Sequence, residues 1–280
     1  MTVMTGQPGA DPQGAPPAAH PGKSGRRRRR IRPRQWILGA VPIAGMLVYW
    51  VTWGVAGGQE SNGLLPTIGD VGTAFRDLAA SGEMFSDATA SLRRVVLAVA
   101  VAAVVGVSLG ALMGVSKIAK ELFTPALELV RPVPIAAWIP LVIIIFGIGE
   151  LPAEVLVFLG TVYPFLLNTL SGVAQTAPIH LRAAAMLGAG RMTTIFRVVL
   201  PSALPSILTA LRLSLGIGWW VTVLAELLAV RSGLGYRLVI AQQNIDTATV
   251  MATIVVTAVI GAALNGLAIL LERRLLRWMH

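Results

Sequence analysis

Long apolar stretches separated by short polar segments dominate the chain from residue 36 onward. The stretches cover residues 36–56, 94–115, 125–147, 152–172, 207–229 and 250–271. About 20 residues in an α-helix cross a hydrocarbon layer of roughly 30 Å, so each stretch can span a membrane. The pattern predicts an all-α polytopic membrane protein with about six transmembrane helices, in a domain covering residues 35–280.

Composition supports this interpretation. Of 280 residues, 55% are hydrophobic and 13% charged, against roughly 25% charged in soluble domains. The chain has no cysteine, which excludes disulfides, thiolate metal sites and a cysteine nucleophile. We find no pair of carboxylates, nucleophile with a base, or metal-ligand spacing, and therefore expect a protein that is not an enzyme.

The first 34 residues differ from the rest. They begin Pro/Gly/Ala-rich and end in a run of arginines, a composition typical of a disordered basic tail. The tail lacks interleaved aromatic residues, so we expect no nucleic-acid partner. Gly22-Lys23-Ser24 resembles the end of a phosphate-binding loop, but Pro17 stands where that motif needs glycine.

Charge predicts the orientation, because Lys and Arg favour cytoplasmic flanks. With the N-terminus inside, inner cations outnumber outer ones by roughly three to one. Beyond the tail, the inner cations are Lys117, Lys120, Arg182, Arg191, Arg197, Arg273, Arg274 and Arg277. We therefore expect a multi-pass protein of the plasma membrane with both termini and residues 178–201 in the cytoplasm. Helical apolar spacing from Val71 to Ala79 predicts a short surface helix on the outer side.

Residues 178–201 form a polar, Ala/Gly-rich insert between two spans. Pro178 can open one helix, Gly188 and Gly190 break it, and a second helix from Thr193 is expected to end at Pro201. Small side chains would let another protein approach the backbone closely. The alternative is an ordinary cytoplasmic loop made basic by topology.

Several residues inside the spans are candidates for lining a pathway. Glu226 is an intramembrane acid near Trp219 and Trp220, and it is either functional or paired with Arg231 or Arg237. The Arg131-Pro132-Val133-Pro134 segment, followed by Pro140, predicts an interruption of the third span. It is either a bent helix that lines the pathway or a structural kink, with Arg131 at the inner edge. Asn168 and Ser214 favour helix–helix hydrogen bonds. Glycines at 106, 110 and 114 predict close helix packing within the chain.

Residues 178–201 also resemble the cytoplasmic loop of binding-protein-dependent ABC importer permeases. Ala183, Ala184, Gly188, Leu200 and Pro201 match that loop in type and spacing, whereas Arg182 replaces its glutamate. From about Ser86 to the C-terminus, the blocks SLRRVVLAVAVAAVVGVSLGALMG, LELVRPVPIAAWIPLVIIIFGIGE and LTALRLSLGIGWWVTVLAELLAVRSGLGY are similar to the nitrate/sulfonate/taurine branch.

The resemblance implies a type I importer permease that carries a small oxyanion such as a sulfonate, taurine or nitrate. Two cytoplasmic ATP-binding subunits, holding ATP and Mg, would dock on the loop. The implied docking residues are Arg182, Ala183, Ala184, Ala185, Leu187, Gly188, Arg191, Leu200 and Pro201. An extracytoplasmic substrate-binding protein and a second permease copy, a homodimer in preference to a heterodimer, would complete the system. A self-sufficient secondary transporter or channel is the competing function.

Overall fold

The computed structural model describes residues 41–42, 45, 48–49, 52 and 66–277. Contacts divide the chain into Met1–Tyr49 and Trp50–His280, and only the second unit is described below. The predicted tail and most of the predicted first span lie outside the described residues. Described residues 66–277 form helices joined by short turns and linkers, and contain no strand. The helices are α2 (Ile68–Ala80), α3 (Glu83–Val115), α4 (Lys117–Val130), α5 (Ile135–Phe146), α6 (Glu150–Ala174), α7 (Pro178–Met186), α8 (Arg191–Thr194), η1 (Ile195–Val199), α9 (Leu200–Leu228), α10 (Leu234–Gln243) and α11 (Thr247–Leu275).

Among the described residues, four helical stretches are long and apolar enough to cross a membrane. They are Glu83–Val115, Glu150–Ala174, Arg191–Leu228 and Thr247–Leu275, and a fifth span is possible if α4 and α5 together form one bent span. The all-α membrane fold predicted from the sequence is confirmed. The helices also extend beyond the apolar windows, most of all at the start of α3.

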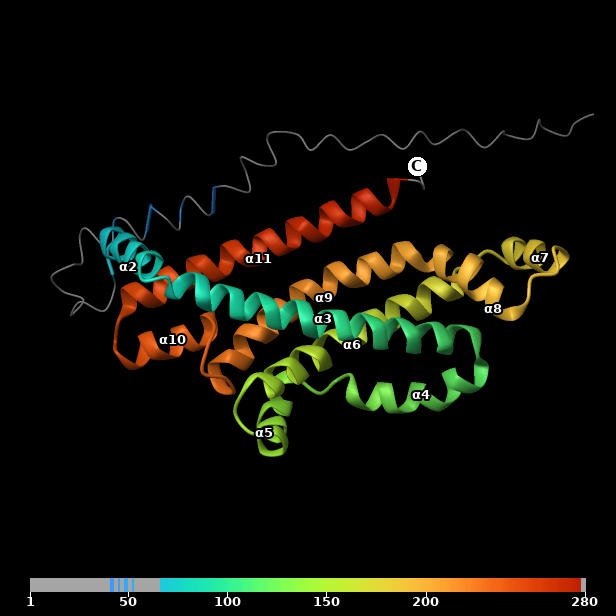
Figure 1. The fold of residues 1–280 in the computed structure, drawn as a ribbon, viewed down its shortest axis with the longest axis horizontal. Coiled ribbons are helices and arrows are strands. Elements are labelled where there is room, and N and C mark those ends of the chain that lie inside the picture. Colours follow the sequence, from blue (N-terminus) through green and yellow to red (C-terminus); the bar gives the residue numbers. More distant parts are fainter. Residues whose placement is uncertain (1–40, 43–44, 46–47, 50–51, 53–65, 278–280) are drawn as a thin grey trace, which may run out of the picture. The chain divides into compact units, whose positions relative to one another are not determined.

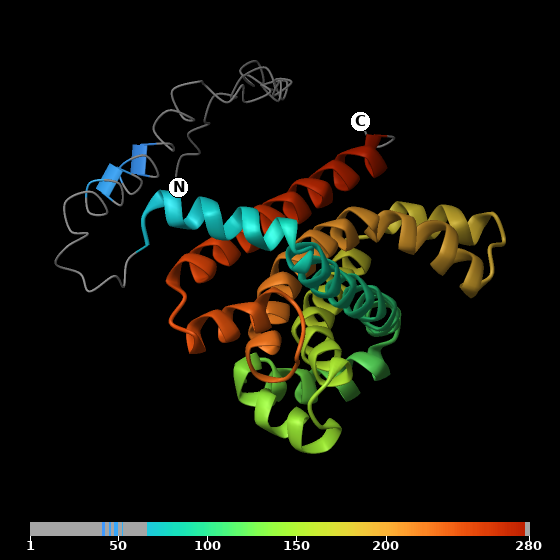
Figure 2. The same ribbon diagram turned by 60° about the vertical axis from the view of Figure 1, so that its left-hand side comes forward.

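The spanning helices run side by side, and the short helices α2, α10, α7 and α8 lie at the two ends of this bundle (Figure 1). Helices α2 and α10 lie at one end, with the start of α3 and the end of α9. Helices α7 and α8 lie at the opposite end and project beyond the bundle in both ribbon views (Figure 2). The predicted surface helix is α2, which begins with a capping box between Thr67 and Asp70.

Glycines let α3 and α6 pack closely. An ideal Cβ built on Gly106 would lie 2.6 Å from the Cβ of Phe165, and one on Gly110 would lie 2.5 Å from the carbonyl oxygen of Leu166. A Cβ built on Gly114 would lie 2.5 Å from Cγ1 of Val173. Membrane helices associate through close packing, because lipid tails are as apolar as their side chains. The glycine stripe therefore packs within this chain, as predicted.

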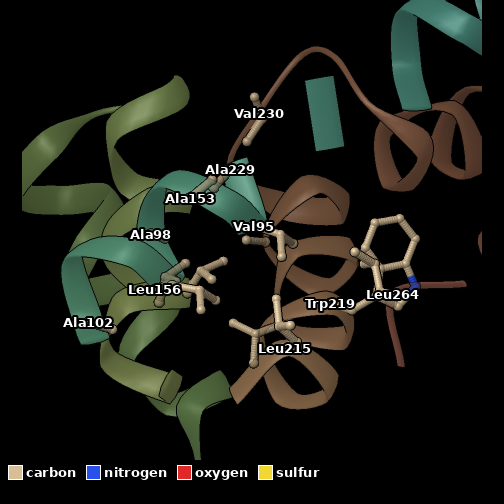
Figure 3. Close-up of a cluster of buried hydrophobic side chains, with 14 of the residues drawn as sticks. Val95, Ala98, Ala102, Ala153, Leu156, Leu215, Trp219, Ala229, Val230 and Leu264 are labelled. Atoms are coloured by element: carbon tan, nitrogen blue, oxygen red, sulfur yellow. The ribbon is translucent and has the colours of Figure 1, made fainter. Parts of the chain in front are cut away.

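The core lies where α3, α6 and α9 meet, and Figure 3 shows part of it. Val95 and Ala102 of α3 and Leu156 of α6 are almost completely buried. Trp219 extends the core from α9 toward α11, where its indole Nε1 donates to the carbonyl oxygen of Thr257 at 3.1 Å. The buried tryptophan thus has the polar partner that its N–H needs.

The third predicted span is broken. Helices α4 and α5 meet at 96°, with the break at residues 131–134. Pro134 caps α5, whereas Pro140 lies inside it. The predicted bend is present at the Arg131-Pro132-Val133-Pro134 segment. Pro140 lies within α5 and does not produce it.

Candidate functional site

Helix α7 and the helix that follows it form a hairpin whose turn depends on Gly188. Gly188 has a φ of 70°, a left-handed conformation that glycine adopts without steric cost. The N–H of Ala189 donates to the carbonyl of Ala184 at 3.0 Å, and the N–H of Gly188 donates to that of Ala185 at 3.0 Å. This pair of bonds is the Schellman motif that ends many helices. The predicted helix–Gly–helix shape is confirmed.

The second helix of the hairpin does not end at Pro201, so that prediction was wrong. It begins at Arg191 and continues through α8, η1 and α9 to Leu228. A π-helical turn over Ile195–Val199 precedes the proline, and the N–H of Leu200 bonds the carbonyl of Ile195. Pro201 lies in the first turn of α9, directly after this irregularity, where a missing N–H is tolerated. The hairpin is therefore continuous with a transmembrane helix.

The outer surface of the hairpin is open. Met186 and Leu187 are 87% and 86% exposed, and Arg182 and Arg191 are exposed as well. A groove of about 730 Å³ runs between α7 and the second helix. Its lining includes His180, Ala183, Leu187, Thr193, Arg197 and Pro201. The surface of the hairpin therefore combines an apolar tip, small side chains and a basic rim.

At the other end of the bundle, Glu226 has a partner that the sequence did not predict. Glu226 and Arg94 are both fully buried, and Arg94 Nη1 lies 2.5 Å from Glu226 Oε1. The predicted pairing with Arg231 or Arg237 is wrong, because α9 turns Glu226 toward α3. A buried ion pair needs further hydrogen bonds to offset its desolvation, and Ser91 Oγ and the N–H of Gly235 donate to Glu226 Oε2 at 2.9 and 2.8 Å.

Arg94 also binds the start of α6. Its Nε and Nη2 donate to the two carboxylate oxygens of Glu150 at 2.7 and 2.6 Å, a bidentate pair. Nη1 donates to the carbonyl oxygen of Ser232 at 3.0 Å. One guanidinium therefore ties α3 to α6, to α9 and to the segment before α10.

A second ion pair extends this outer network. Arg237 of α10 donates to Asp87 at 2.8 Å and to Glu83 at 2.7 Å. Asp87 accepts the N–H of Gly233 at 3.2 Å. Gly233 has a φ of 101°, and a Cβ there would lie 2.4 Å from Glu226 Oε1. The network fixes the segment between α9 and α10 against α3.

The other predicted pathway residues divide into two groups. Ser214 and Trp219 are buried within the chain, with Ser214 Oγ donating to the carbonyl of Thr161 at 3.1 Å. Asn168 Nδ2 donates to the carbonyl of Pro164 on its own helix at 2.8 Å. The side chain of Trp220 is 52% exposed, and Pro134 and Pro140 are exposed as well. Burial removes Ser214, Trp219 and Glu226 from any open surface of this chain.

Sequence reasoning missed three charged positions. It placed Arg94 at the outer border of a span, although the residue is buried. It placed Arg131 at the inner edge, whereas Arg131 lies over the ring of Tyr163, 5.9 Å from the centroid and near the middle of α6. Arg212, exposed in the middle of α9, was not singled out. The signal that could have identified all three positions is that each is a charged residue within a predicted apolar stretch.

Apolar helices long enough to cross a membrane, with an exposed hairpin continuous with one of them, define a polytopic membrane protein. The family described as binding-protein-dependent transport system inner membrane component matches residues 102–277. The chain belongs to this family. It is therefore the inner membrane component of an ABC transport system, which works with ATP-binding subunits and a substrate-binding protein and does not itself hydrolyse ATP.

Relatives in the branch that the sequence suggested are similar over most of the chain. The taurine transport system permease protein TauC of Escherichia coli (strain K12) is 41% identical over 69% of this chain and 73% of its own length. The putative aliphatic sulfonates transport permease protein SsuC of Bacillus subtilis (strain 168) is 35% identical over 88% of both chains. The bicarbonate transport system permease protein CmpB of Synechococcus elongatus is 30% identical over 85% of this chain and 90% of its own.

A solved structure supports the fold. The structure of the MetNI methionine ABC transporter in inward-facing conformations contains a chain that superposes with a TM-score of 0.58 at 17% identity. The match covers 66% of this chain and 92% of that one. At this identity the likeness shows the fold, which is that of a type I importer permease.

Proposed function

We propose that this permease imports a small oxyanion of the sulfonate class, using ATP hydrolysed by two cytoplasmic subunits docked on the α7–α8 hairpin. The observation that carries the docking assignment is the continuity of the hairpin with α9. The exposed tip at Met186 and Leu187 is the surface that a partner would grip. A substrate-binding protein would deliver the solute at the α2 and α10 end, and both termini would lie in the cytoplasm.

Rigid coupling explains how a docked subunit would move the bundle. The helix from Arg191 to Leu228 carries the second arm of the hairpin at one end and Glu226 at the other. Displacement of the hairpin therefore reaches the outer network without crossing a loop. Binding of ATP and Mg to the partners would favour one of two bundle conformations, which is the requirement for alternating access.

Relatives' names support the solute class. Taurine and aliphatic sulfonates carry a sulfonate group, and bicarbonate is also an oxyanion. The pathway would lie between two copies of this chain, because the described helices leave the face of α9 that carries Arg212 exposed. A homodimer is the simplest assembly that provides the cover.

The competing function, a secondary transporter or channel, loses its main support. Glu226 was the acid that a proton-coupled carrier could use. Its two oxygens are engaged by Arg94, Ser91 and Gly235. A carboxylate held in this way is a structural anchor and a poor proton carrier.

Cross-linking tests the docking assignment directly, because the natural chain has no cysteine. Leu187→Cys should cross-link to the ATP-binding subunit in the assembled complex. Ile148→Cys is the matched control, because Ile148 is 60% exposed and its neighbour Gly149 bonds Ala229 at the opposite end of α9. A cross-link from Ile148→Cys but not from Leu187→Cys would reverse the orientation and reject the docking surface.

A further inference from the structure

Arg212 is a cation in the middle of a spanning helix. The nearest charged residues along α9 and its extension are Arg197 and Glu226, 15 and 14 positions away, or roughly 20 Å on each side at 1.5 Å per residue. An arginine side chain is too short to reach either end of the helix. Intramembrane cations are costly and mark ion or substrate pathways by default, so the position of Arg212 calls for a partner or for water.

The partners of Arg212 within the chain are few. Its Nε lies 3.4 Å from Asn265 Oδ1 of α11, which is a long hydrogen bond. No other hydrogen bond or salt bridge to Arg212 is present among the described residues, and both side chains are exposed. Because a guanidinium has donors only, the asparagine must turn its oxygen toward it. The Asn265 amide group and the two Nη groups of Arg212 are therefore all available as donors.

Within residues 66–277, no helix covers the face of α9 that carries Arg212. Thr209, Leu213, Gly216 and Trp220 share this face at helical spacing, and all are exposed. A Cβ built on Gly216 would meet nothing within 4 Å. Arg212 makes this face an unsuitable surface for lipid tails, because a charge within the hydrocarbon layer is costly. No acid occurs on α9 before Glu226, which lies on the buried side.

A second cation lies at about the same depth. Helices α6 and α9 run in opposite directions, and the Ser214–Thr161 hydrogen bond sets their level. Arg212 lies two residues before Ser214, and Tyr163, which Arg131 covers, lies two residues after Thr161. Arg212 and the Tyr163 ring that Arg131 covers thus lie at the same level of the bundle, each about 3 Å along its helix axis from the Ser214–Thr161 hydrogen bond. Arg131 has the exposed acid Glu128 three residues before it, so Arg212 is the stronger anion ligand.

We infer that Arg212, with Asn265 beside it, binds the oxyanion of the solute inside the membrane as it passes along the open face of α9. The inference rests on the proposed function. A planar guanidinium recognises two oxygens of a sulfonate or carbonate at once, which a lysine ammonium does not. The charge offsets the loss of hydration that the anion suffers at mid-membrane. The solute, and not a carboxylate of a second copy, is then the counter-ion.

A cysteine at Gly216, one turn from Arg212, reports on this face in the assembled transporter. The probes are the anionic 2-sulfonatoethyl methanethiosulfonate and its cationic trimethylammonioethyl counterpart, each normalised to a free thiol. We expect Gly216→Cys to react roughly tenfold faster with the anionic reagent, the effect of one favourable charge contact in a hydrated pathway. Ethanesulfonate should slow the reaction. Val104→Cys, on an apolar exposed face of α3, should not react.

Adding Arg212→Met to Gly216→Cys should abolish the anion preference, whereas adding Arg212→Lys should retain most of it. Failure of both reagents to react would mean that lipid or a second copy covers the face, and would overturn the inference. So would an anion preference that survives Arg212→Met. The thiol test needs no ATP and is therefore independent of the test of the proposed function. If Leu187→Cys cross-links to the ATP-binding subunit but Gly216→Cys shows no anion preference, the permease assignment stands and only the anion site is rejected.

Discussion

Arg94 and Glu226 lie 132 positions apart in the sequence and form a fully buried ion pair, 2.5 Å between Nη1 and Oε1. Removal of Arg94 leaves the Glu226 carboxylate buried without a cation, which costs about 3–5 kcal/mol. Removal of the Glu226 charge costs less, because Arg94 keeps its pair with Glu150. We expect Arg94→Met and Glu226→Gln each to lower the thermal stability of the purified protein in detergent. The double variant should recover part of the loss, because it leaves no unpaired charge at this position.

Arg93 provides the control for that experiment. Its pair with Glu150 spans 3.2 Å, and the Arg93 side chain is 61% exposed. Exposed pairs contribute about 0–1 kcal/mol, so Arg93→Met should leave the melting temperature almost unchanged. Equal losses from Arg93→Met and Arg94→Met would contradict the view that Arg94 anchors the outer network.

Gly188 should be replaceable only by residues that tolerate its backbone. A Cβ there would meet nothing within 4 Å, so the restriction comes from the φ of 70° and not from crowding. Asparagine tolerates this conformation far better than a β-branched residue does. We expect Gly188→Asn to keep the stimulation of the partner ATPase by the loaded binding protein. Gly188→Val should reduce it severalfold without loss of membrane insertion, and equal activity of the two variants would remove the turn from the coupling account.

Gly110 should tolerate no larger residue, because α6 lies against it. A Cβ would lie 2.5 Å from the Leu166 carbonyl oxygen and 2.9 Å from the Thr169 Cβ. Overpacking of this kind costs about 1–3 kcal/mol, so Gly110→Val should lower the melting temperature by several degrees. Gly266→Ala on α11, where a Cβ meets nothing within 4 Å, is the control and should not destabilise the protein.

The N-terminal turn of α2 should depend on pH through Asp70. The Thr67 hydroxyl donates to the Asp70 carboxylate and, with the Thr67 N–H, lowers the pKa of Asp70 below its usual value. A lowered pKa stabilises the folded turn above the unfolded pKa of about 3.9, and this stability is lost as pH falls through the folded pKa. Hydrogen exchange of the α2 amides, corrected for intrinsic rates, should rise below that range. In Thr67→Val, protection should be lower near neutral pH and should change less with acid.

The sequence predicted much of the fold and less of the sites. Apolar windows located the spanning helices because length and hydrophobicity alone determine what can cross a bilayer. The helix-breaking tendency of Gly188 and Gly190 predicted the hairpin turn, and the resemblance of residues 178–201 to the importer permease loop supported it. Pairing between distant helices was beyond sequence reasoning: nothing in the neighbourhood of Glu226 indicates that α3 brings Arg94 to it. The helix past Pro201 was also missed, because a π-helical turn accommodates a proline that usually ends a helix.

The docking of ATP-binding subunits on the hairpin and the oxyanion pathway remain proposals that share one requirement, a partner that supplies energy. Uptake of radiolabelled ethanesulfonate into proteoliposomes that contain this chain and the loaded binding protein tests that requirement most directly. We predict ATP-dependent uptake when the ATP-binding subunits are present and none without them, whatever ion gradient is imposed. Uptake by the chain alone, driven by an ion gradient without ATP, would contradict the account.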